Sequence, residues 1–352
     1  MTKLVVAKFG GSAIGPDGLS VPIIIQRINE LKKDSKVVCV FSAPLTIQDG
    51  KTRSITDIVL DLGRKAESSE EFTLDKVKET YEKILELVST EFQDGCKKII
   101  EEFLDTAKKS LLEAKAKKEF ANEVRSNTLA YSGELLMSNM MNFILKSQGI
   151  KSASVPFDSW PIITDKNIES TNFLYSESAE NASILEELLE ENEVVTIGGF
   201  IGKTVDGITT TYERGGSDRT AADLGILLHK KFDARIDFEK DSAVVSADPK
   251  IVKEELAEVN QLSYNEARLA GMFGMKILDP IAIKEILENG VDIPIMVTNM
   301  KNPENITTIK RSPDTQNGHP LKIVTGKKNC AIFRIETDAA TRLLVSLEKD
   351  KR

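Results

Sequence analysis

The sequence predicts an α/β protein in which helices cover both faces of a mostly parallel central sheet. Short β-rich segments alternate with segments of helical periodicity along the chain, and this alternation is typical of parallel sheets. The predicted strands are largely apolar, as expected of strands buried on both faces. Because 352 residues exceed one typical domain, we expect two lobes, or one large α/β domain with appendages.

The elements are predicted from local patterns. Helical periodicity separates the first two strands near residues 21–32, and a long charged helical region extends from about 57 to 146. In this region Ser132 and Gly149 are the predicted N-cap and C′ residues of one helix. The predicted strands are 4–10 (LVVAKFG), 36–43 (KVVCVFSA), 151–157 (KSASVPF), 193–202 (EVVTIGGFIG), 230–238 (KKFDARIDF) and 292–300 (DIPIMVTNM).

Composition excludes several classes of protein. The chain has 47 basic and 55 acidic side chains and a net charge of −8. We therefore expect neither a nucleic acid nor an anionic membrane as its partner. Its apolar runs are shorter than the roughly 20 residues that cross a bilayer. Three scattered cysteines and two histidines predict neither a disulfide framework nor a metal site. The N-terminus lacks the apolar core of a signal peptide, so we expect a cytoplasmic protein.

Glycine-rich segments follow predicted strands at 8–13 (KFGGSA), 198–207 (GGFIGKTVDG) and 212–218 (YERGGSD). In open α/β sheets ligands bind beyond the carboxyl ends of the strands, where exposed N–H groups and helix N-termini favour phosphate. Lys8, beside Gly10 and Gly11, would add a positive charge. The segments match neither the Walker loop nor the dinucleotide fingerprint.

Each motif taken alone has an ordinary structural explanation. KFGGS alone predicts a tight turn from strand to helix, and SGE at 132–134 alone predicts a helix cap. Ser217 and Asp218 alone predict a capped N-terminus favoured by the helix dipole. Together these motifs meet at one edge of the predicted sheet, and this convergence favours a phosphate site.

The motifs KFGGS, SGE, GFIG, TTYERGGSD, SADPKIV and FGMKILDP occur in the order and spacing of an aspartate kinase. From about residue 4 to 310 the chain therefore resembles that family, which belongs to the wider amino-acid kinase fold. The resemblance implies transfer of the ATP γ-phosphoryl group to the β-carboxylate of L-aspartate, giving 4-phospho-L-aspartate. This reaction begins lysine, threonine and methionine biosynthesis.

The resemblance also implies an architecture and partners. The fold would be a three-layer sandwich of the carbamate kinase type with a short C-terminal α+β appendage. Residues 1–310 would form the catalytic domain, with an acceptor-binding lobe at about 1–200 and a nucleotide-binding lobe at about 201–310. ATP and Mg²⁺ would be required, L-aspartate would be the substrate, and the protein would be a homodimer.

The resemblance further implies roles for the matching residues. Lys8 and Asp218 would be catalytic: Lys8 holds the transferring phosphoryl group, and Asp218 organises Lys8 and Mg²⁺. Asp218 need not act as a base, because the attacking carboxylate is already ionised at pH 7. Glu134 would receive the substrate ammonium group, and the planar guanidinium of Arg214 would pair with a carboxylate. The other acceptor-site residues would be Thr56, Gly215, Gly216 and Ser217, and the other phosphate-side residues Gly10, Gly11, Ser12, Lys250 and Lys276.

The chain departs from the family pattern at several positions. Tyr212 and Glu213 replace Leu-Gly before Arg214, and Glu239-Lys240 replaces a Thr-Asp pair that meets the nucleoside. Further along, Val245 replaces an aromatic residue, Lys250 an arginine and Asp279 a histidine.

These departures leave two alternatives open. One is another enzyme of the same fold that phosphorylates a different carboxylate or a phosphate. The other is a non-catalytic regulatory paralogue.

The C-terminal part of the chain predicts a joint and a tail. Residues 302–320 (NPENITTIKRSPDTQNGHP) collect prolines, glycine and polar residues, which are typical of a connecting segment. Residues 321–352 are too few for a full ACT unit, the regulatory domain found in this family. We expect a partial ACT-like tail there, and no complete ACT pair.

Overall fold

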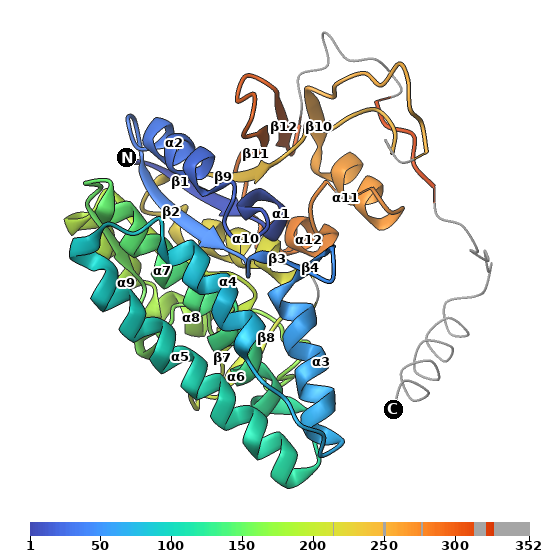
Figure 1. Cartoon of the computed structure of the whole chain (residues 1–352). Coiled ribbons are helices and arrows are strands. Elements are labelled where there is room, and N and C mark those ends of the chain that lie inside the picture. Colours follow the sequence, from blue (N-terminus) through green and yellow to red (C-terminus); the bar gives the residue numbers. More distant parts are fainter. Residues whose placement is uncertain (214, 249–250, 276, 313–321, 327–352) are drawn as a thin grey trace.

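The computed structural model describes residues 1–213, 215–248, 251–275, 277–312 and 322–326. Within these ranges the central sheet has eight strands in the order β10-β12-β11-β9-β1-β2-β6-β5. β12 runs antiparallel to β11, and all other neighbouring strands are parallel. The predicted fold class, a mostly parallel sheet between helical layers, is therefore confirmed (Figure 1).

Each predicted strand corresponds to a strand of this sheet, usually a shorter one. The segment 193–202 divides into two strands, because the chain turns at Gly199 and at Phe200, which has a φ of 70°. The strands of the central sheet are β1 (Lys3–Phe9), β2 (Lys36–Phe41), β5 (Ser152–Ser154), β6 (Val194–Gly198), β9 (Asp233–Lys240), β10 (Gln261–Ser263), β11 (Ile295–Asn299) and β12 (Ile306–Lys310).

Two short hairpins lie outside the sheet. β3 (Leu45–Gln48) pairs with β4 (Lys51–Ser54), and β7 (Ile201–Lys203) pairs with β8 (Thr209–Thr211). The sequence patterns predicted no strand where β3 and β4 lie. They also missed β8, β10 and β12, because strands of three to five residues give too short a pattern to distinguish from loops.

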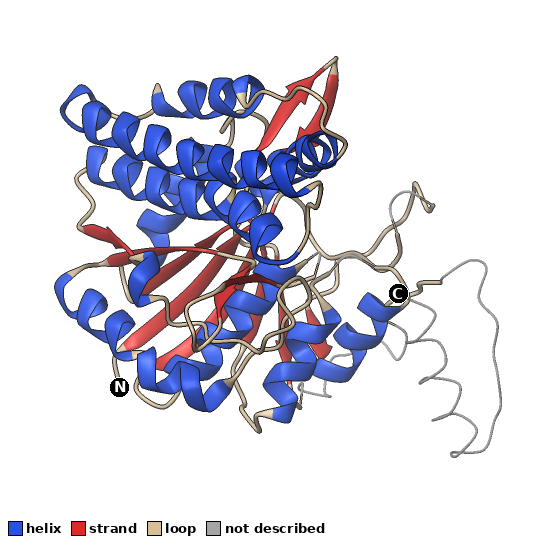
Figure 2. Cartoon of the chain, turned by 90° about the horizontal axis from the view of Figure 1, so that it is seen from below, coloured by secondary structure: helices blue, strands red, loops and turns tan. Residues whose placement is uncertain are grey.

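Helices pack on both faces of the sheet (Figure 2). One face carries α8 (Tyr175–Asn181), α9 (Ser183–Glu191), α10 (Gly216–Leu228), α11 (Tyr264–Met272) and α12 (Pro280–Glu288). The other face and the layer outside it carry α2 (Val21–Leu31), α3 (Ile55–Glu67), α4 (Asp75–Leu85), α5 (Thr90–Lys117), α6 (Asn122–Ser132) and α7 (Glu134–Ser147). Two shorter helices are α1 (Gly11–Ile14) and the 3₁₀ turn η1 (Phe157–Ser159).

The pleat of β1 assigns its side chains to these two layers. Leu4 and Val6 belong to the core under α10, whereas Val5 and Ala7 belong to the core under α2 and α7. Because successive side chains alternate between faces, Lys8 lies on the α10 face. The catalytic lysine predicted from the sequence is thus directed toward the start of α10.

The predicted helix cap at Ser132 was wrong. Ser132 is the last residue of α6, and its hydroxyl donates to the Thr128 carbonyl oxygen at 2.6 Å. Gly133 instead occupies the N-cap position of α7. The other end is confirmed, because Gly149 follows the C-cap residue Gln148 with a φ of 72°.

Part of the predicted joint at 302–320 was also wrong. β12 occupies residues 306–310 and pairs with β11 and β10, burying Thr307 and Ile309. Residues 313–320 lie outside the described ranges, as does most of the predicted tail at 321–352. Within the described part of that tail, Lys322 contacts Glu266 at 3.1 Å. No helix in the described ranges is both long and apolar enough to span a membrane.

Candidate active site

A cavity of about 630 Å³ lies beyond the carboxyl ends of β1, β2 and β6. Most of the residues that the sequence predicts for substrate and phosphate meet there, although they come from segments far apart in the chain. Its polar rim also includes Ser42, Arg125, Glu169 and Glu213. The predicted residues that line it are Lys8, Gly11, Ser12, Thr56, Glu134, Gly215, Gly216 and Ser217. Arg214, Lys250 and Lys276 lie outside the described residues.

The loop after β1 brings backbone close to the lysine. A Cβ added at Gly10 would lie 3.1 Å from the Lys8 Nζ, and one at Gly11 would lie 2.9 Å from the Ala43 carbonyl oxygen. A side chain at Gly10 would fill the space beside the ammonium group, and one at Gly11 would collide with the backbone that follows β2. The glycines therefore leave room for a ligand to contact Lys8 and the backbone of the loop.

Lys8 is held by the first turn of α10. Its Nζ lies 2.7 Å from the Asp218 Oδ1, and both side chains are nearly buried. The Asp279 N–H donates to the other Asp218 oxygen at 3.0 Å. Burial alone would raise the pKa of Asp218, but the charges of Lys8 and Lys240 and these hydrogen bonds lower it below its ordinary value. Asp218 is consequently an anion that fixes the position of Lys8.

The turn into α10 depends on glycine. Gly215 has a φ of 97°, which disfavours any residue with a Cβ. A Cβ there would also lie 2.8 Å from the Asp279 Oδ2. One residue into the helix, Ser217 accepts a hydrogen bond from the Ser42 hydroxyl at 3.0 Å, which joins this turn to the end of β2.

Glu134 is the buried acid of the cavity. It begins α7 and is only 5% exposed. Desolvation raises the pKa of its carboxyl group to about 7, although the N–H groups of Ala43 and Glu134 itself and the charge of Lys8 act in the opposite direction. Its Oε2 has no hydrogen-bond partner among the described residues. A buried carboxylate oxygen without a partner is costly, and a cationic ligand group in the cavity would satisfy it.

The rim of the cavity contains charged residues that sequence reasoning missed or misjudged. Arg125 of α6 pairs with Glu169 at 2.5 Å, and neither residue belongs to a motif. Glu213 adds a negative charge next to the predicted carboxylate-binding Arg214 in the sequence. Its Oε1 accepts a hydrogen bond from the Ser170 hydroxyl at 2.8 Å. The Glu213 carboxylate is thus engaged by the loop that precedes α8.

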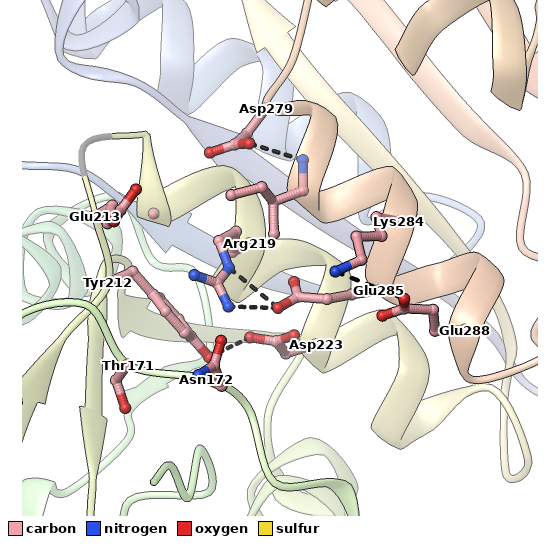
Figure 3. A network of polar contacts seen from close by, with 12 residues as sticks. Thr171, Asn172, Tyr212, Glu213, Arg219, Asp223, Asp279, Lys284, Glu285 and Glu288 are labelled. Atoms are coloured by element: carbon pink, nitrogen blue, oxygen red, sulfur yellow. Dashed lines mark hydrogen bonds and ion pairs between the residues drawn. The ribbon is translucent and has the colours of Figure 1, made fainter. Parts of the chain in front are cut away.

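A buried polar network connects α10 to α12 (Figure 3). The Tyr212 hydroxyl donates to Asp223 at 2.5 Å, and the Arg219 guanidinium lies over the Tyr212 ring, 4.1 Å from its centre. Arg219 also donates through Nε and Nη2 to Glu285 at 3.1 and 2.5 Å. Burial, followed by the charge of Glu285, raises the pKa of Asp223. The substitution at Tyr212 therefore has a structural role in joining the two helices.

The same two helices meet again beside the Lys8–Asp218 pair. Asp279 caps α12 by accepting from the Ile281 N–H at 2.8 Å, and its own N–H bonds to Asp218. Arg219–Glu285 fixes α12 further along its length. The position of Asp218, and through it that of Lys8, thus depends on how α12 docks against α10.

A second, smaller cavity of about 200 Å³ lies beside the end of β9. Its polar lining residues are Lys240, Ser242 and Asp248, and Val245 adds apolar surface. Glu239 is not part of this cavity, because its carboxylate accepts a hydrogen bond from Arg27 of α2 at 2.8 Å. Glu239, which stands at a position of the family's Thr-Asp pair, is thus directed toward α2. No cluster of three or more potential metal ligands occurs within the described ranges.

Comparison with known proteins identifies the family. Residues 3–299 match the family model of the amino acid kinase family. The chain belongs to this family. The match spans most of the residues that carry the two cavities, from Lys8 to Ile277, so both cavities are features of an amino acid kinase domain.

The sequence relatives within the family are aspartokinases. The chain is 28% identical over 346 residues to a chloroplastic bifunctional aspartokinase/homoserine dehydrogenase 2 of Arabidopsis thaliana, covering 94% of this chain and 35% of the relative. It is 25% identical over 313 residues to the lysine-sensitive aspartokinase 3 of Escherichia coli, covering 86% and 63%. The chain thus spans about a third to somewhat under two thirds of these relatives.

Solved structures with the same fold are also aspartate kinases. E. coli aspartokinase III in complex with aspartate and ADP has a TM-score of 0.74 at 23% identity, over 89% of this chain and 66% of that one. The aspartate kinase of Clostridium acetobutylicum has a TM-score of 0.66 at 23% identity, over 92% and 66%. At this identity the likeness establishes the fold.

Loss of the link between α10 and α12 should destabilise the domain. We expect Arg219→Met to lower the free energy of unfolding by about 3–5 kcal/mol, because it leaves the buried Glu285 without its cation. Urea denaturation followed by circular dichroism measures this change. Lys284→Met is the matched control on α12, because the partner of Lys284 among the described residues is the exposed Glu288 at 3.6 Å, and it should change stability by less than about 0.5 kcal/mol. Equal midpoints for the two variants would contradict the role assigned to Arg219.

Proposed function

We propose that this protein is an aspartate kinase that transfers the ATP γ-phosphoryl group to the β-carboxylate of L-aspartate, giving 4-phospho-L-aspartate. The observation that carries the proposal is a cavity in which a buried, unpartnered Glu134 oxygen lies in the same space as the Lys8–Asp218 pair. The first group suits an ammonium ion and the second a phosphoryl group, as a phosphorylated amino acid requires. The aspartokinase relatives support the same assignment.

The acceptor would be held by groups from both sides of the cavity. Glu134 would receive the α-ammonium group of aspartate, and Thr56 and Ser217 would donate hydroxyl hydrogen bonds from α3 and α10. Gly215 and Gly216 would shape the wall opposite α3. Arg214, which follows Glu213 in the sequence, remains our predicted partner for a substrate carboxylate, because its planar guanidinium allows bidentate pairing.

The chemistry requires charge to be neutralised between two anions. Phosphoryl transfer is catalysed mainly by positioning and by electrostatic stabilisation of the equatorial oxygens. Lys8 and the backbone beside Gly10, Gly11 and Ser12 would provide that stabilisation. The β-carboxylate attacks phosphorus as an anion, so no side chain removes a proton, and Asp218 serves to hold Lys8 in place.

The second cavity suits the nucleotide donor. It lies at the end of β9, next to β1, so a nucleotide there could extend its phosphates toward Lys8. Lys250 and Lys276 remain predicted phosphate-side residues. Mg²⁺ would arrive bound to the phosphates, since it commonly keeps waters and takes few protein ligands. We infer an acceptor lobe at about 1–200 and a nucleotide lobe at about 201–310, with the start of α10 reaching from the second lobe to the acceptor.

Assembly follows from the resemblance, and location from the cysteines. We infer a homodimer, because aspartate kinases commonly assemble in this way. We also infer a cytoplasmic protein, because free cysteines suit a reducing compartment. Cys39 and Cys96 are both buried, free thiols.

The direct test of the proposed function traps the product. Purified protein with ATP, Mg²⁺ and L-aspartate should yield a coloured hydroxamate when hydroxylamine is added, because an acylphosphate reacts with this nucleophile. Lys8→Ala should abolish the signal while circular dichroism remains that of the wild type. Product with glutamate or another acceptor instead of aspartate would move the assignment to another enzyme of the fold. Wild-type turnover by Lys8→Ala would contradict the role of Lys8.

The pH dependence of acceptor binding should report on Glu134. Burial raises its pKa to about 7 from 4.5, so below pH 7 the free protein holds it neutral and unable to pair with an ammonium group. We therefore expect the KM for aspartate to rise as the pH falls below 7, by up to about tenfold per pH unit. Glu134→Gln should have a high KM that does not change between pH 5.5 and 8.

Glu169→Gln is the control for this measurement, because Glu169 lines the same cavity but is partly exposed and paired with Arg125. Steady-state kinetics at a series of pH values measures all three proteins. The Glu169 variant should keep the wild-type slope. An unchanged slope in the Glu134 variant would show that another group controls acceptor binding.

A further inference from the structure

The end of β9 directs its side chains to two different layers. Asp237 and Glu239 face α2, where Arg27 contacts them at 3.3 and 2.8 Å. Phe238 belongs to the opposite core, under α10. Because side chains alternate along a strand, Lys240 lies on the Phe238 side. The acidic residue of the Glu239-Lys240 pair is thus turned away from the ligand cavities and the basic one is turned toward them.

The register of the sheet places Lys240 near the catalytic lysine. β9 pairs in parallel with β1, so that Lys8 lies opposite Phe238 and Phe9 lies opposite Glu239. Lys240, the next residue of β9, is therefore two residues nearer the ligand edge of the sheet than Lys8, and it lies on the same face. This edge is where α10 begins and where the loop after β1 exposes its glycines.

Two further observations link the Lys240 side chain to the second cavity and to the Lys8–Asp218 pair. Lys240 is half-buried and lines the second cavity together with Ser242 and Asp248. Its charge also reaches the other site, since it contributes, after Lys8, to the low pKa of Asp218. One cation thus acts on the proposed nucleotide cavity and on the pair that organises phosphoryl transfer.

We propose that Lys240 binds the phosphate chain of the nucleotide donor, between the nucleoside pocket and Lys8. This inference rests on the proposed function for the identity of the donor. A lysine ammonium is a compact charge with three donors, and it suits phosphate oxygens. The family's acidic residue at this position meets the nucleoside, so the reversed charge moves binding energy from the sugar to the phosphates. Lys240 is accordingly a residue that makes this chain select for the number of phosphates on its ligand.

The buried cluster behind the strand keeps Lys240 in this position. Asp237 accepts a hydrogen bond from Thr298 of β11 at 2.7 Å, and Glu239 and Asp237 share Arg27. The Lys240 carbonyl oxygen also accepts from the Met300 N–H at 2.9 Å. These contacts hold the backbone of the strand end, so the lysine side chain begins from a fixed point.

Isothermal titration calorimetry with ATP, ADP and adenosine at constant Mg²⁺ tests the inference without turnover. Lys240→Met should weaken ATP binding about tenfold or more, as expected from losing one charge-assisted hydrogen bond. ADP binding should weaken less, and adenosine binding should change less than about twofold. Lys240→Arg should recover part of the ATP affinity. Lys301→Met is the control, because it removes an equal charge from the exposed turn after β11 and should leave all three affinities unchanged.

Equal losses for ATP and adenosine would overturn the inference, because they would indicate damage to the pocket instead of a lost phosphate contact. An ATP affinity unchanged in Lys240→Met would overturn it as well. If the wild type binds ATP, shows the phosphate-dependent loss in Lys240→Met and yet forms no hydroxamate with aspartate, the aspartate assignment fails and the role of Lys240 stands. A wild-type protein that binds none of the three ligands would overturn both.

Discussion

The ion pair between Lys8 and Asp218, at 2.7 Å, is the contact on which the arrangement of the site depends. It joins the end of the central strand β1 to the first turn of α10, and it keeps one cation beside a glycine loop that a ligand can reach. An unpaired buried charge is expensive, so each member of the pair fixes the other. Around this contact the chain gathers the buried acid Glu134, the hydroxyl groups of Thr56 and Ser217, and a second cavity beside the end of β9.

The sheet and the packing of α12 against α10 bring the residues of the site together from distant parts of the sequence. Parallel strands bring KFGGS, the segment SAP at 42–44 and GGFIG to one edge of the central sheet, because the carboxyl ends of such strands point the same way. α12 then supports the pair from behind through the Asp279 N–H and the Arg219–Glu285 link. Several departures from the family pattern become intelligible here: Tyr212 and Arg219 form one buried network with Asp223 and Glu285, and Asp279 caps α12.

Much of this site could be predicted from the sequence, because its motifs are local. Lys8, Glu134 and Ser217 were found since glycines or a helix start mark them, and the structure brings all three to one cavity. The rest could not be predicted, because it depends on which face of the sheet a side chain occupies and on contacts between segments that are far apart in the chain. The direction of Glu239 toward Arg27 follows from the pleat and from the placement of α2. The bond between Ser170 and Glu213 likewise joins a loop and a turn with no shared pattern.

The most direct test of the central claim is the kinetics of Asp218→Asn. This substitution removes the charge that holds Lys8 but retains a side-chain oxygen for the Asp279 N–H. If the pair organises phosphoryl transfer, kcat should fall by about 10²-fold or more, while the KM for aspartate changes only a few-fold and the circular dichroism spectrum at the assay temperature remains that of the folded wild type. A kcat within a few-fold of the wild type would show that Lys8 does not need Asp218, and it would contradict the account.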